Sequence, residues 1–138
     1  MQTLYTAKAT STGSGRAGHV RTDDEVLDHE LSVPTELGGA GGSGTNPEQL
    51  FAAGYAACFH SALQLIGRRD KVRVRGSSVT AEVGIGPAGE GFGLVVTLVV
   101  EVPDVEPGVA EKLVAAAHQV CPYSNATRGN IDVTLRVA

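Results

Sequence analysis

The chain has 138 residues and a formal net charge of −4, with eleven lysines and arginines against fifteen aspartates and glutamates. This length favours a single domain over residues 1–138, large enough to bury a core without a disulfide or a metal ion. The negative net charge argues against a nucleic-acid or anionic-membrane partner. The sequence contains no run of about 18 apolar residues, so no membrane span is predicted. The start of the chain lacks the basic end and apolar run of a signal peptide, and with two cysteines this predicts a cytoplasmic protein.

Three strands are expected in the first part of the chain, over residues 2–10, 16–22 and 27–33. Apolar and polar side chains alternate in the first and the third of them, and a turn at Asp23-Asp24 closes the second. A glycine-rich stretch follows, and residues 39–44 match the dinucleotide-binding pattern G-x-G-x-x-G. Neither a βαβ unit nor an acidic residue at the ribose-binding distance accompanies this pattern. We therefore interpret the stretch as a flexible loop that lets the chain come close to a packed helix.

A central helix is expected to begin near residue 47. Thr45 and Glu48 fit a capping box, and Asn46-Pro47 offers a second, overlapping start with proline at the first helical position. Gly67 is the expected C-terminal stop.

This predicted helix, residues 47–66, is unusually apolar. Residues 50–59 carry no charge and no strongly polar side chain, so the helix lacks the polar face of a surface helix. One sheet covers only one side of a helix. We therefore expect a second subunit to cover the other side and the protein to be a homodimer.

The second part of the chain predicts two strands over residues 72–85 and 92–102, joined by a glycine-rich turn into an antiparallel hairpin. The strand over 92–102 is apolar on both faces and should be central. A helix over 107–120, a short helical turn over 124–129 and a last strand over 131–137 complete the order βββ-α-ββ-α-β. This order predicts an α+β fold with largely antiparallel sheet.

The two cysteines are the main candidates for chemistry. Cys58 lies within the apolar helix, where burial raises the pKa of a thiol, and its plain interpretation is a small hydrophobic residue. Cys121 lies at a helix C-terminus, where the dipole opposes a thiolate, so Cys58 must attack if the pair is catalytic. Cys58 then needs a neighbouring cation, and the sequence offers Arg16, Arg21 and Arg128 without choosing among them.

Other kinds of site have weaker support. The four histidines are scattered and the two cysteines lie far apart, so no metal-ligand spacing is present and we expect no bound metal. A Cys–His hydrolase would need Cys58 and a histidine to meet in space, and no local signature supports one. The basic residues between positions 68 and 75 are interpreted as a solvated helix end and strand face, since no aromatic residues are interleaved with them as in a nucleic-acid surface.

Several blocks of this sequence closely resemble the organic hydroperoxide resistance (Ohr) proteins of the OsmC-like superfamily. They are Gly-Arg-Ala-Gly-His at 15–19, Glu-Leu-Gly-Gly at 36–39, the stretch 44–59 around Cys58, and the stretch 117–130 around Cys121. The resemblance covers nearly the whole chain. It implies the OsmC-like fold, an α+β intertwined dimer with central helices packed between largely antiparallel sheets.

The resemblance also implies a thiol-dependent peroxidase that reduces alkyl and fatty-acid hydroperoxides to alcohols. Cys58 matches the peroxidatic cysteine, Cys121 the resolving cysteine, Arg16 the arginine that activates the thiolate, and Glu48 the glutamate that orients this arginine. A Cys58 sulfenic acid would condense with Cys121 to a disulfide, which dihydrolipoamide or a lipoylated protein would reduce; no cofactor is expected to be bound. The alternative is an OsmC-like redox-sensing or lipid-binding module without peroxidase turnover.

Glu48 and Cys58 lie ten residues apart on the same predicted helix. This spacing separates them by about 15 Å along the axis and by roughly 80° around it, more than a glutamate side chain spans. If Arg16 touches both residues, the most economical arrangement takes Glu48, with or without Arg16, from the partner subunit. We therefore hypothesise two composite active sites at the dimer interface.

Overall fold

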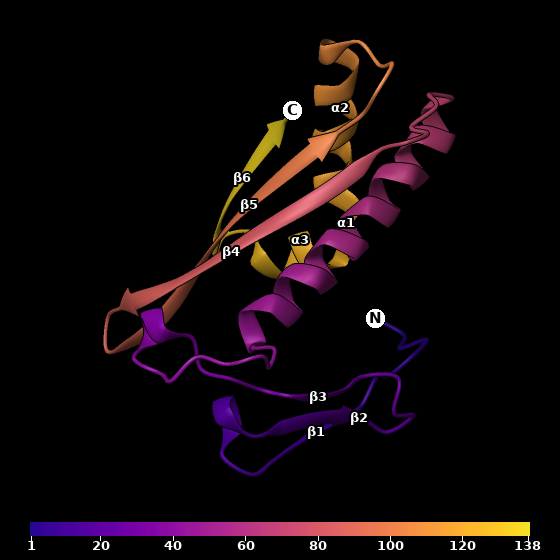
Figure 1. The fold of residues 1–138 in the computed structure, drawn as a ribbon. Helices are drawn as coiled ribbons and strands as arrows, with labels where there is room; N and C mark the ends of the chain where they lie inside the picture. Colours follow the sequence, from indigo (N-terminus) through magenta and orange to yellow (C-terminus); the bar gives the residue numbers. More distant parts are fainter. The chain divides into compact units, whose positions relative to one another are not determined.

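The computed structural model describes all residues, 1–138, and has an α+β fold, as predicted (Figure 1). Its strands form two three-stranded sheets. The chain divides into two compact units, Met1–Leu50 and Phe51–Ala138, and each unit is described by itself. The single domain expected from the sequence stays a prediction.

Unit 1 contains the first sheet, with strand order β1-β2-β3 and antiparallel pairing throughout. Its elements are β1 (Ala9–Thr12), the 3₁₀ turn η1 (Gly15–Ala17), β2 (His19–Thr22), β3 (Asp28–Glu30) and the 3₁₀ turn η2 (Thr35–Leu37). All three strands are shorter than predicted. Residues 2–8 are not a strand, because the pairing between β1 and β2 begins only at Ala9 and Thr22. Alternating side chains are not sufficient to form a strand where no neighbouring strand pairs with the backbone N–H and C=O groups.

The glycine-rich stretch after β3 is a loop, as predicted. A Cβ at Gly39 would lie 2.3 Å from the carbonyl oxygen of Val33, and one at Gly44 would lie 2.6 Å from the carbonyl carbon of Leu31. The close approach is therefore made to the chain just before the loop, rather than to a packed helix as expected. Glycine is required here because a side chain has no room.

Helix α1 (Pro47–Asp70) begins at the second of the two predicted starts. The side-chain oxygen of Asn46 accepts a hydrogen bond from the backbone N–H of Gln49 at 2.8 Å, which is the geometry of an N-cap. Thr45 instead donates its hydroxyl to the Gln49 side chain at 2.8 Å, and the carboxylate of Glu48 is held by an arginine described below. The capping box of Thr45 with Glu48 is therefore not formed.

The end of α1 differs from the prediction, because the helix passes Gly67 and continues to Asp70. Lys71 follows in the left-handed conformation with φ of 57°. The N–H of Lys71 donates to the carbonyl of Arg68 at 3.3 Å and the N–H of Val72 donates to that of Gly67 at 2.8 Å, the two bonds of a Schellman motif. Gly67 serves close packing instead, since a Cβ there would lie 2.9 Å from the carbonyl oxygen of Val72.

Unit 2 contains the second sheet, with strand order β4-β5-β6. Strands β4 (Ser78–Ala88) and β5 (Gly91–Glu101) form the predicted antiparallel hairpin, and β5 is central, as predicted. Strand β4 begins six residues later than expected from the predicted start at 72, because a turn between Val74 and Ser77 with Gly76 at φ of 74° intervenes.

Strand β6 (Asp132–Val137) pairs with β5 in parallel, so this sheet is mixed. A parallel pair requires a crossover connection, which here consists of α2 (Pro107–Val120) and α3 (Pro122–Thr127). Helix α2 has the bounds predicted from the sequence, and α3 begins two residues earlier than predicted.

The core of unit 2 lies between this sheet and the two long helices, which cross the same face of the sheet (Figure 1). The largest fully buried apolar side chains come from α1 and β5: Tyr55, Phe59, Leu63, Ile66, Val96, Leu98 and Val100. The opposite face of α1 is open in the single chain, where Ala53, Ala57, Ser61 and Leu65 are exposed, Leu65 by 51%. By length and composition α1 would also pass as a membrane span, a test that core helices of packed domains pass as well.

Candidate functional site

The structure brings Cys58 of α1 and Cys121, at the junction of α2 and α3, into contact. Their sulfur atoms are 3.5 Å apart, with the thiol of Cys121 donating to Cys58, and both cysteines are free. Cys58 is half-buried and Cys121 is fully buried. Packing of α1 and α2 on one sheet face explains how two residues 63 positions apart meet. Cys58 is therefore the more exposed of the two residues.

Cys121 ends one helix and begins the next. Its N–H donates to the carbonyl of Ala117 at 2.9 Å, and its carbonyl accepts from the N–H of Asn125 at 2.9 Å. Pro122 takes the first position of α3, where a missing N–H has no consequence. The sequence reasoning placed Cys121 only at a helix C-terminus, and the proline after it was the signal that a second helix starts there.

The surroundings of Cys58 oppose its ionisation. Burial is the largest cause and raises the pKa of the Cys58 thiol, while a hydrogen bond from the backbone N–H of Tyr123 acts in the opposite direction and Cys121 raises the pKa further. A thiolate in an apolar site loses hydration that one N–H does not replace. Within unit 2 the thiol form of Cys58 is therefore favoured.

Tyr123 is a site residue that the sequence reasoning missed. Its ring packs against Phe51 and Tyr55, with ring centroids 6.1 Å and 5.6 Å away. It also lies over Gly54 of α1, where a Cβ would come within 2.7 Å of the tyrosine hydroxyl oxygen. These contacts fix the start of α3, and with it the N–H that faces Cys58. No spacing in the sequence indicates this packing.

A buried hydroxyl network holds the α2–α3 turn. Tyr55 hydrogen-bonds through its hydroxyl with Ser124 at 2.8 Å and with Thr127 at 3.1 Å, and Nδ1 of His118 hydrogen-bonds with the Ser124 hydroxyl at 2.8 Å. Burial, and then the charge of Arg128, lower the pKa of His118. Arg128 donates to the carbonyl of His118 at 3.0 Å, so one of the three candidate cations is used to hold this turn.

Unit 1 contains the other two predicted residues, Arg16 in η1 and Glu48 in the first turn of α1. They form a bidentate ion pair, with Nη1 and Nη2 of Arg16 donating to the two carboxylate oxygens of Glu48 at 2.9 Å and 2.7 Å. The Glu48 side chain is 12% exposed and the Arg16 side chain 43%. The hydrogen bond from Arg16 lowers the pKa of Glu48, so the pair is ionised at neutral pH. The remaining N–H groups of the guanidinium are free to bind another anion.

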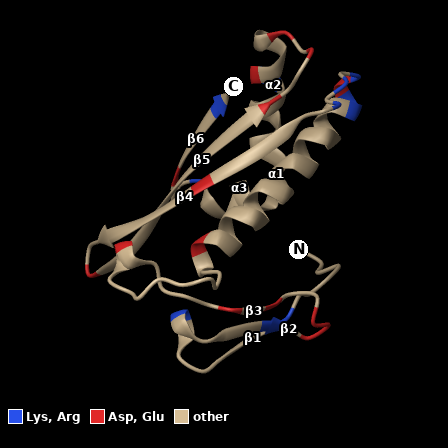
Figure 2. Ribbon diagram, viewed as in Figure 1, with Lys and Arg blue, Asp and Glu red and all other residues tan.

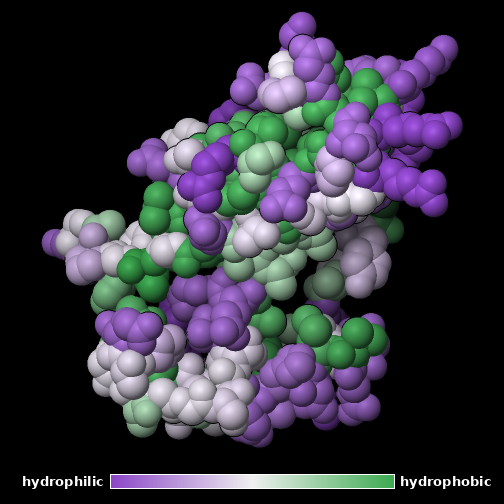
Figure 3. All heavy atoms as spheres, turned by 45° about the horizontal axis from the view of Figure 1, so that its top comes forward, coloured by the Kyte–Doolittle hydropathy of each residue, from purple (hydrophilic) through white to green (hydrophobic).

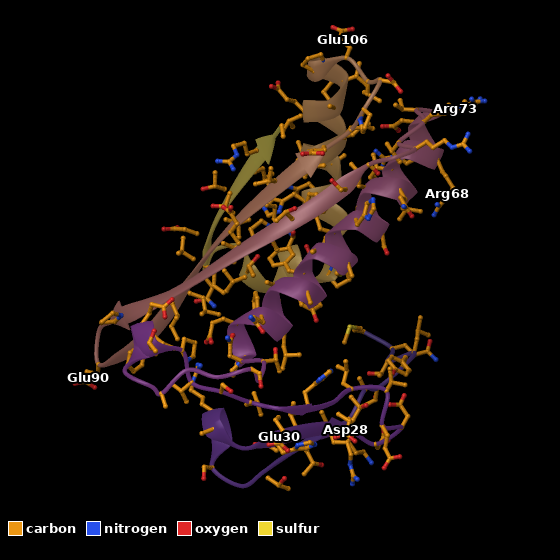
Figure 4. The ribbon with its side chains drawn as sticks, in the orientation of Figure 1. Asp28, Glu30, Arg68, Arg73, Glu90 and Glu106 are labelled. Carbon is orange, nitrogen blue, oxygen red and sulfur yellow. The ribbon has the colours of Figure 1, made fainter.

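A second charged cluster in unit 1 was not expected. His19 of β2 is hydrogen-bonded to Glu30 at 2.8 Å and to Asp28, both on β3 (Figure 4). The two carboxylates, Glu30 first, raise the pKa of His19. Arg21, another candidate cation, pairs with Glu25 at 3.3 Å. The four predicted site residues thus form two pairs, Cys58 with Cys121 and Arg16 with Glu48, one in each unit.

Comparison with known proteins agrees with the resemblance drawn from the sequence. The family of OsmC-like proteins matches residues 39–136. An organic hydroperoxide resistance protein of Xanthomonas axonopodis pv. citri (strain 306) is 58% identical over 136 residues, which cover 98% of this chain and 95% of that protein. Organic hydroperoxide resistance protein OhrB of Bacillus subtilis (strain 168) is 47% identical over 97% of this chain and 98% of its own length. The crystal structure of an organic hydroperoxide resistance protein from Elizabethkingia anophelis matches with a TM-score of 0.94 at 53% identity, covering 100% of this chain and 99% of that one. The chain therefore belongs to the OsmC/Ohr family.

Proposed function

We propose that this protein provides resistance to organic hydroperoxides as a thiol-dependent peroxidase that uses Cys58 and Cys121. Relatives at 47–58% identity over nearly the full chain are named for organic hydroperoxide resistance, which supports the general function. The peroxidase mechanism is supported by one observation above all. A half-buried and a fully buried free thiol have their sulfur atoms 3.5 Å apart.

In the first step the Cys58 thiolate attacks one oxygen of the hydroperoxide. The O–O bond breaks, the alkoxide leaves and takes up a proton to become the alcohol, and Cys58 becomes a sulfenic acid. We assign this role to Cys58 because it is only half-buried, whereas Cys121 is fully buried.

In the second step the sulfur of Cys121 attacks the sulfenic sulfur. A disulfide forms and the hydroxyl group leaves with a proton as water. The two sulfurs must approach from 3.5 Å to about 2 Å, the length of a disulfide bond. This short movement keeps the sulfenic acid from reacting with a second peroxide.

In the third step a dithiol reduces the disulfide of Cys58 and Cys121. Its two thiols transfer two electrons and two protons by thiol–disulfide exchange and close to a disulfide of their own. We assign this role to a dihydrolipoyl group, free or carried by a protein, as the resemblance implies. A cycle that ends in reduction suits the cytoplasm predicted from the cysteine content.

Activation of Cys58 requires a positive charge, because burial favours its thiol form. We assign this charge to Arg16, oriented by its bidentate pair with Glu48. Since Glu48 and Cys58 are about 15 Å apart along the axis of α1, we place Arg16 and Glu48 of a partner subunit beside Cys58. The exposed apolar face of α1 supports such a homodimer, since an apolar helix face in water is unfavourable until a partner covers it.

The substrate class follows from the apolar surroundings of Cys58. Cys58 packs against the apolar core cluster, and its sulfur is faced by the main-chain N–H of Tyr123, whose ring packs on Phe51. Apolar surroundings of this kind favour an alkyl or fatty-acyl chain and give hydrogen peroxide little to contact. We expect catalytic efficiency to be higher for a long-chain lipid hydroperoxide than for hydrogen peroxide.

The experiment is stopped-flow consumption of cumene hydroperoxide with dihydrolipoamide as reductant. Cys58→Ser should abolish consumption, and Cys121→Ser should permit one oxidation per subunit and then stop. Undiminished turnover in Cys58→Ser would contradict the mechanism. Subunit origin is tested by mixing inactive Arg16→Gln and Cys58→Ser proteins under conditions of subunit exchange. If each site takes Arg16 from the partner, a mixed dimer has one complete site, with Cys58 from the Arg16→Gln subunit and Arg16 from the Cys58→Ser subunit, and part of the activity returns. If each site lies within one chain, no activity returns.

A further inference from the structure

One region of unit 2 concentrates positive charge that the proposed chemistry does not use. Five of the eleven basic residues of the chain fall between positions 68 and 75, with a single acidic residue among them. We call this group the basic patch; its members are Arg68, Arg69, Lys71, Arg73 and Arg75. The acidic residue, Asp70, is bound by Arg69 at 3.1 Å. The other four cations are exposed and make no hydrogen bond or ion pair within the chain.

The position of these cations is only partly explained by the helix end. Arg68 and Arg69 lie in the last turn of α1, where cations are favourable, but the dipole effect fades within that turn. Beyond it Val72 and Val74 pack against the core, so the side chains between and after them, Arg73 and Arg75, turn outward. Figure 4 shows Arg68 and Arg73 pointing away from the body of the unit. Two of the carbonyls at the end of α1, those of Gly67 and Arg68, are already capped by backbone N–H groups.

The four unpaired cations surround a hollow in the surface. An open cavity of about 650 Å³ is lined by these four cations together with Gln64, Gly67, Val72 and Val74. Guanidinium groups bind carboxylates in a bidentate manner, and several unneutralised cations around one hollow raise its potential. The hollow is therefore built to receive acidic groups. Hydrophilic side chains project from this end of the unit in the space-filling view (Figure 3).

The charge of the rest of the chain indicates the size of the partner. Outside residues 68–75 the chain has six basic and fourteen acidic residues. The positions of lysine and arginine, blue on the ribbon, gather at the end of α1 (Figure 2). An acidic macromolecule is repelled by most of this surface and steered to the patch. A nucleic acid fits poorly, because no aromatic residue lines the hollow for base stacking and the overall charge is negative.

We propose that the basic patch is the docking surface for an acidic protein that carries the reducing dithiol. The role of this partner as reductant rests on the proposed function. The docking itself rests only on the charges of the patch. Arg68 is ten residues from Cys58 on α1, about 15 Å along the helix axis. A dihydrolipoyl group on a lysine side chain is a long flexible arm of the kind that such a separation requires.

Docking is tested by binding of fluorescent lipoyl-lysine peptides to the full-length protein. One peptide has glutamates on both sides of the modified lysine and the other has serines. We expect the acidic peptide to bind more tightly, and the R73E/R75E variant to lose about tenfold in affinity for it. The matched control K112E/R136E makes the same change in net charge at exposed positions outside the patch and should bind as the wild type does. Salt that shortens the Debye length below about 5 Å should remove the preference.

Turnover tests the role of the docked partner. With cumene hydroperoxide and the reduced acidic peptide, kcat/KM should fall about tenfold in R73E/R75E, and with free dihydrolipoamide it should be unchanged. Three results would each overturn the proposal. They are an equal loss of kcat/KM in K112E/R136E, equal turnover with the serine peptide, and a changed oligomeric state of R73E/R75E in light scattering. No turnover of free dihydrolipoamide by the wild type would instead contradict the proposed function, and the binding experiment would still decide whether the patch docks acidic groups.

Discussion

The packing of Tyr123 over Gly54 is a point where one methyl group should affect both stability and the reactive sulfur. A Cβ at Gly54 would lie 2.7 Å from the Tyr123 hydroxyl oxygen and 3.2 Å from two ring carbons. The ring is held on its other sides by Phe51 and Tyr55, so it must move outward or displace the start of α3. The perturbation is Gly54→Ala.

The magnitude follows from two opposing effects. Replacing a glycine inside a helix by alanine stabilises by about 0.5–1 kcal/mol. Overpacking by one methyl group costs about 1–3 kcal/mol. The lower part of this range applies, because the closest atom is the end of a tyrosine side chain that is 39% exposed. We expect Gly54→Ala to destabilise by about 1 kcal/mol, and to stabilise by about 0.5–1 kcal/mol when Tyr123→Ala has removed the ring.

The assay is urea unfolding of the reduced wild type, Gly54→Ala, Tyr123→Ala and the double variant at one protein concentration. A coupling energy of about 1.5–2 kcal/mol between the two positions is the expected result. The pKa of Cys58, followed by thiolate absorbance, should rise in Gly54→Ala, because a displaced α3 removes the Tyr123 N–H from the sulfur. Equal stabilisation by Gly54→Ala in both backgrounds would refute the reasoning.

Three further predictions concern titration and buried hydroxyls. Glu30 and Asp28 raise the pKa of His19, so the charged ring adds its full stability below about pH 6.5. This stability is lost as the pH rises through the pKa of His19 in the folded protein. The urea midpoint of the wild type should therefore fall over this pH range, and that of His19→Gln should lack this fall. Burial lowers the pKa of His118, so the stability that its neutral ring adds to the folded protein is complete above about pH 6.5 and is lost as the pH falls. NMR titration should give a lower pKa for the His118 imidazole than for that of His19. Tyr55→Phe should destabilise by about 1–2 kcal/mol in urea unfolding, because it leaves two buried hydroxyl partners without their bond.

The elements that the sequence predicted well are those whose signals are local. The bounds of α2 agree because its apolar spacing, its first-position proline and the proline after Cys121 all lie within one segment. The central position of β5 follows from its apolar residues on both faces. The three strands of unit 1 are present but shorter than predicted, because pairing depends on a neighbour, which a pattern of alternating side chains does not supply. The predicted start of β4 was wrong because a turn at Gly76 comes before the strand.

The site divides in the same way. The resemblance identified Cys58, Cys121, Arg16 and Glu48, and the structure places them in two contacting pairs. The Tyr123 N–H beside Cys58 could not be found, because it depends on how α3 packs across α1. The Schellman end of α1 was also hidden, since a lysine in the left-handed conformation is uncommon and Gly67 offered the more usual stop.

The pair of Arg16 and Glu48 allows a last prediction that separates charge from orientation. As an ion pair it is neutral overall, so it stabilises a nearby thiolate less than a lone guanidinium does, and Glu48→Gln would leave the guanidinium with its full positive charge. If charge alone activates Cys58, Glu48→Gln should lower the Cys58 pKa and speed peroxide reduction. The bidentate geometry instead uses one edge of the guanidinium and aims its free N–H groups in a fixed direction. Orientation then dominates, and Glu48→Gln should reduce kcat/KM for cumene hydroperoxide by about tenfold to a hundredfold and raise the pKa of Cys58, because the guanidinium no longer faces the sulfur. Stopped-flow rates and thiolate absorbance measured on the same reduced protein decide between the two, and a variant faster than the wild type would show that Glu48 only attenuates the charge.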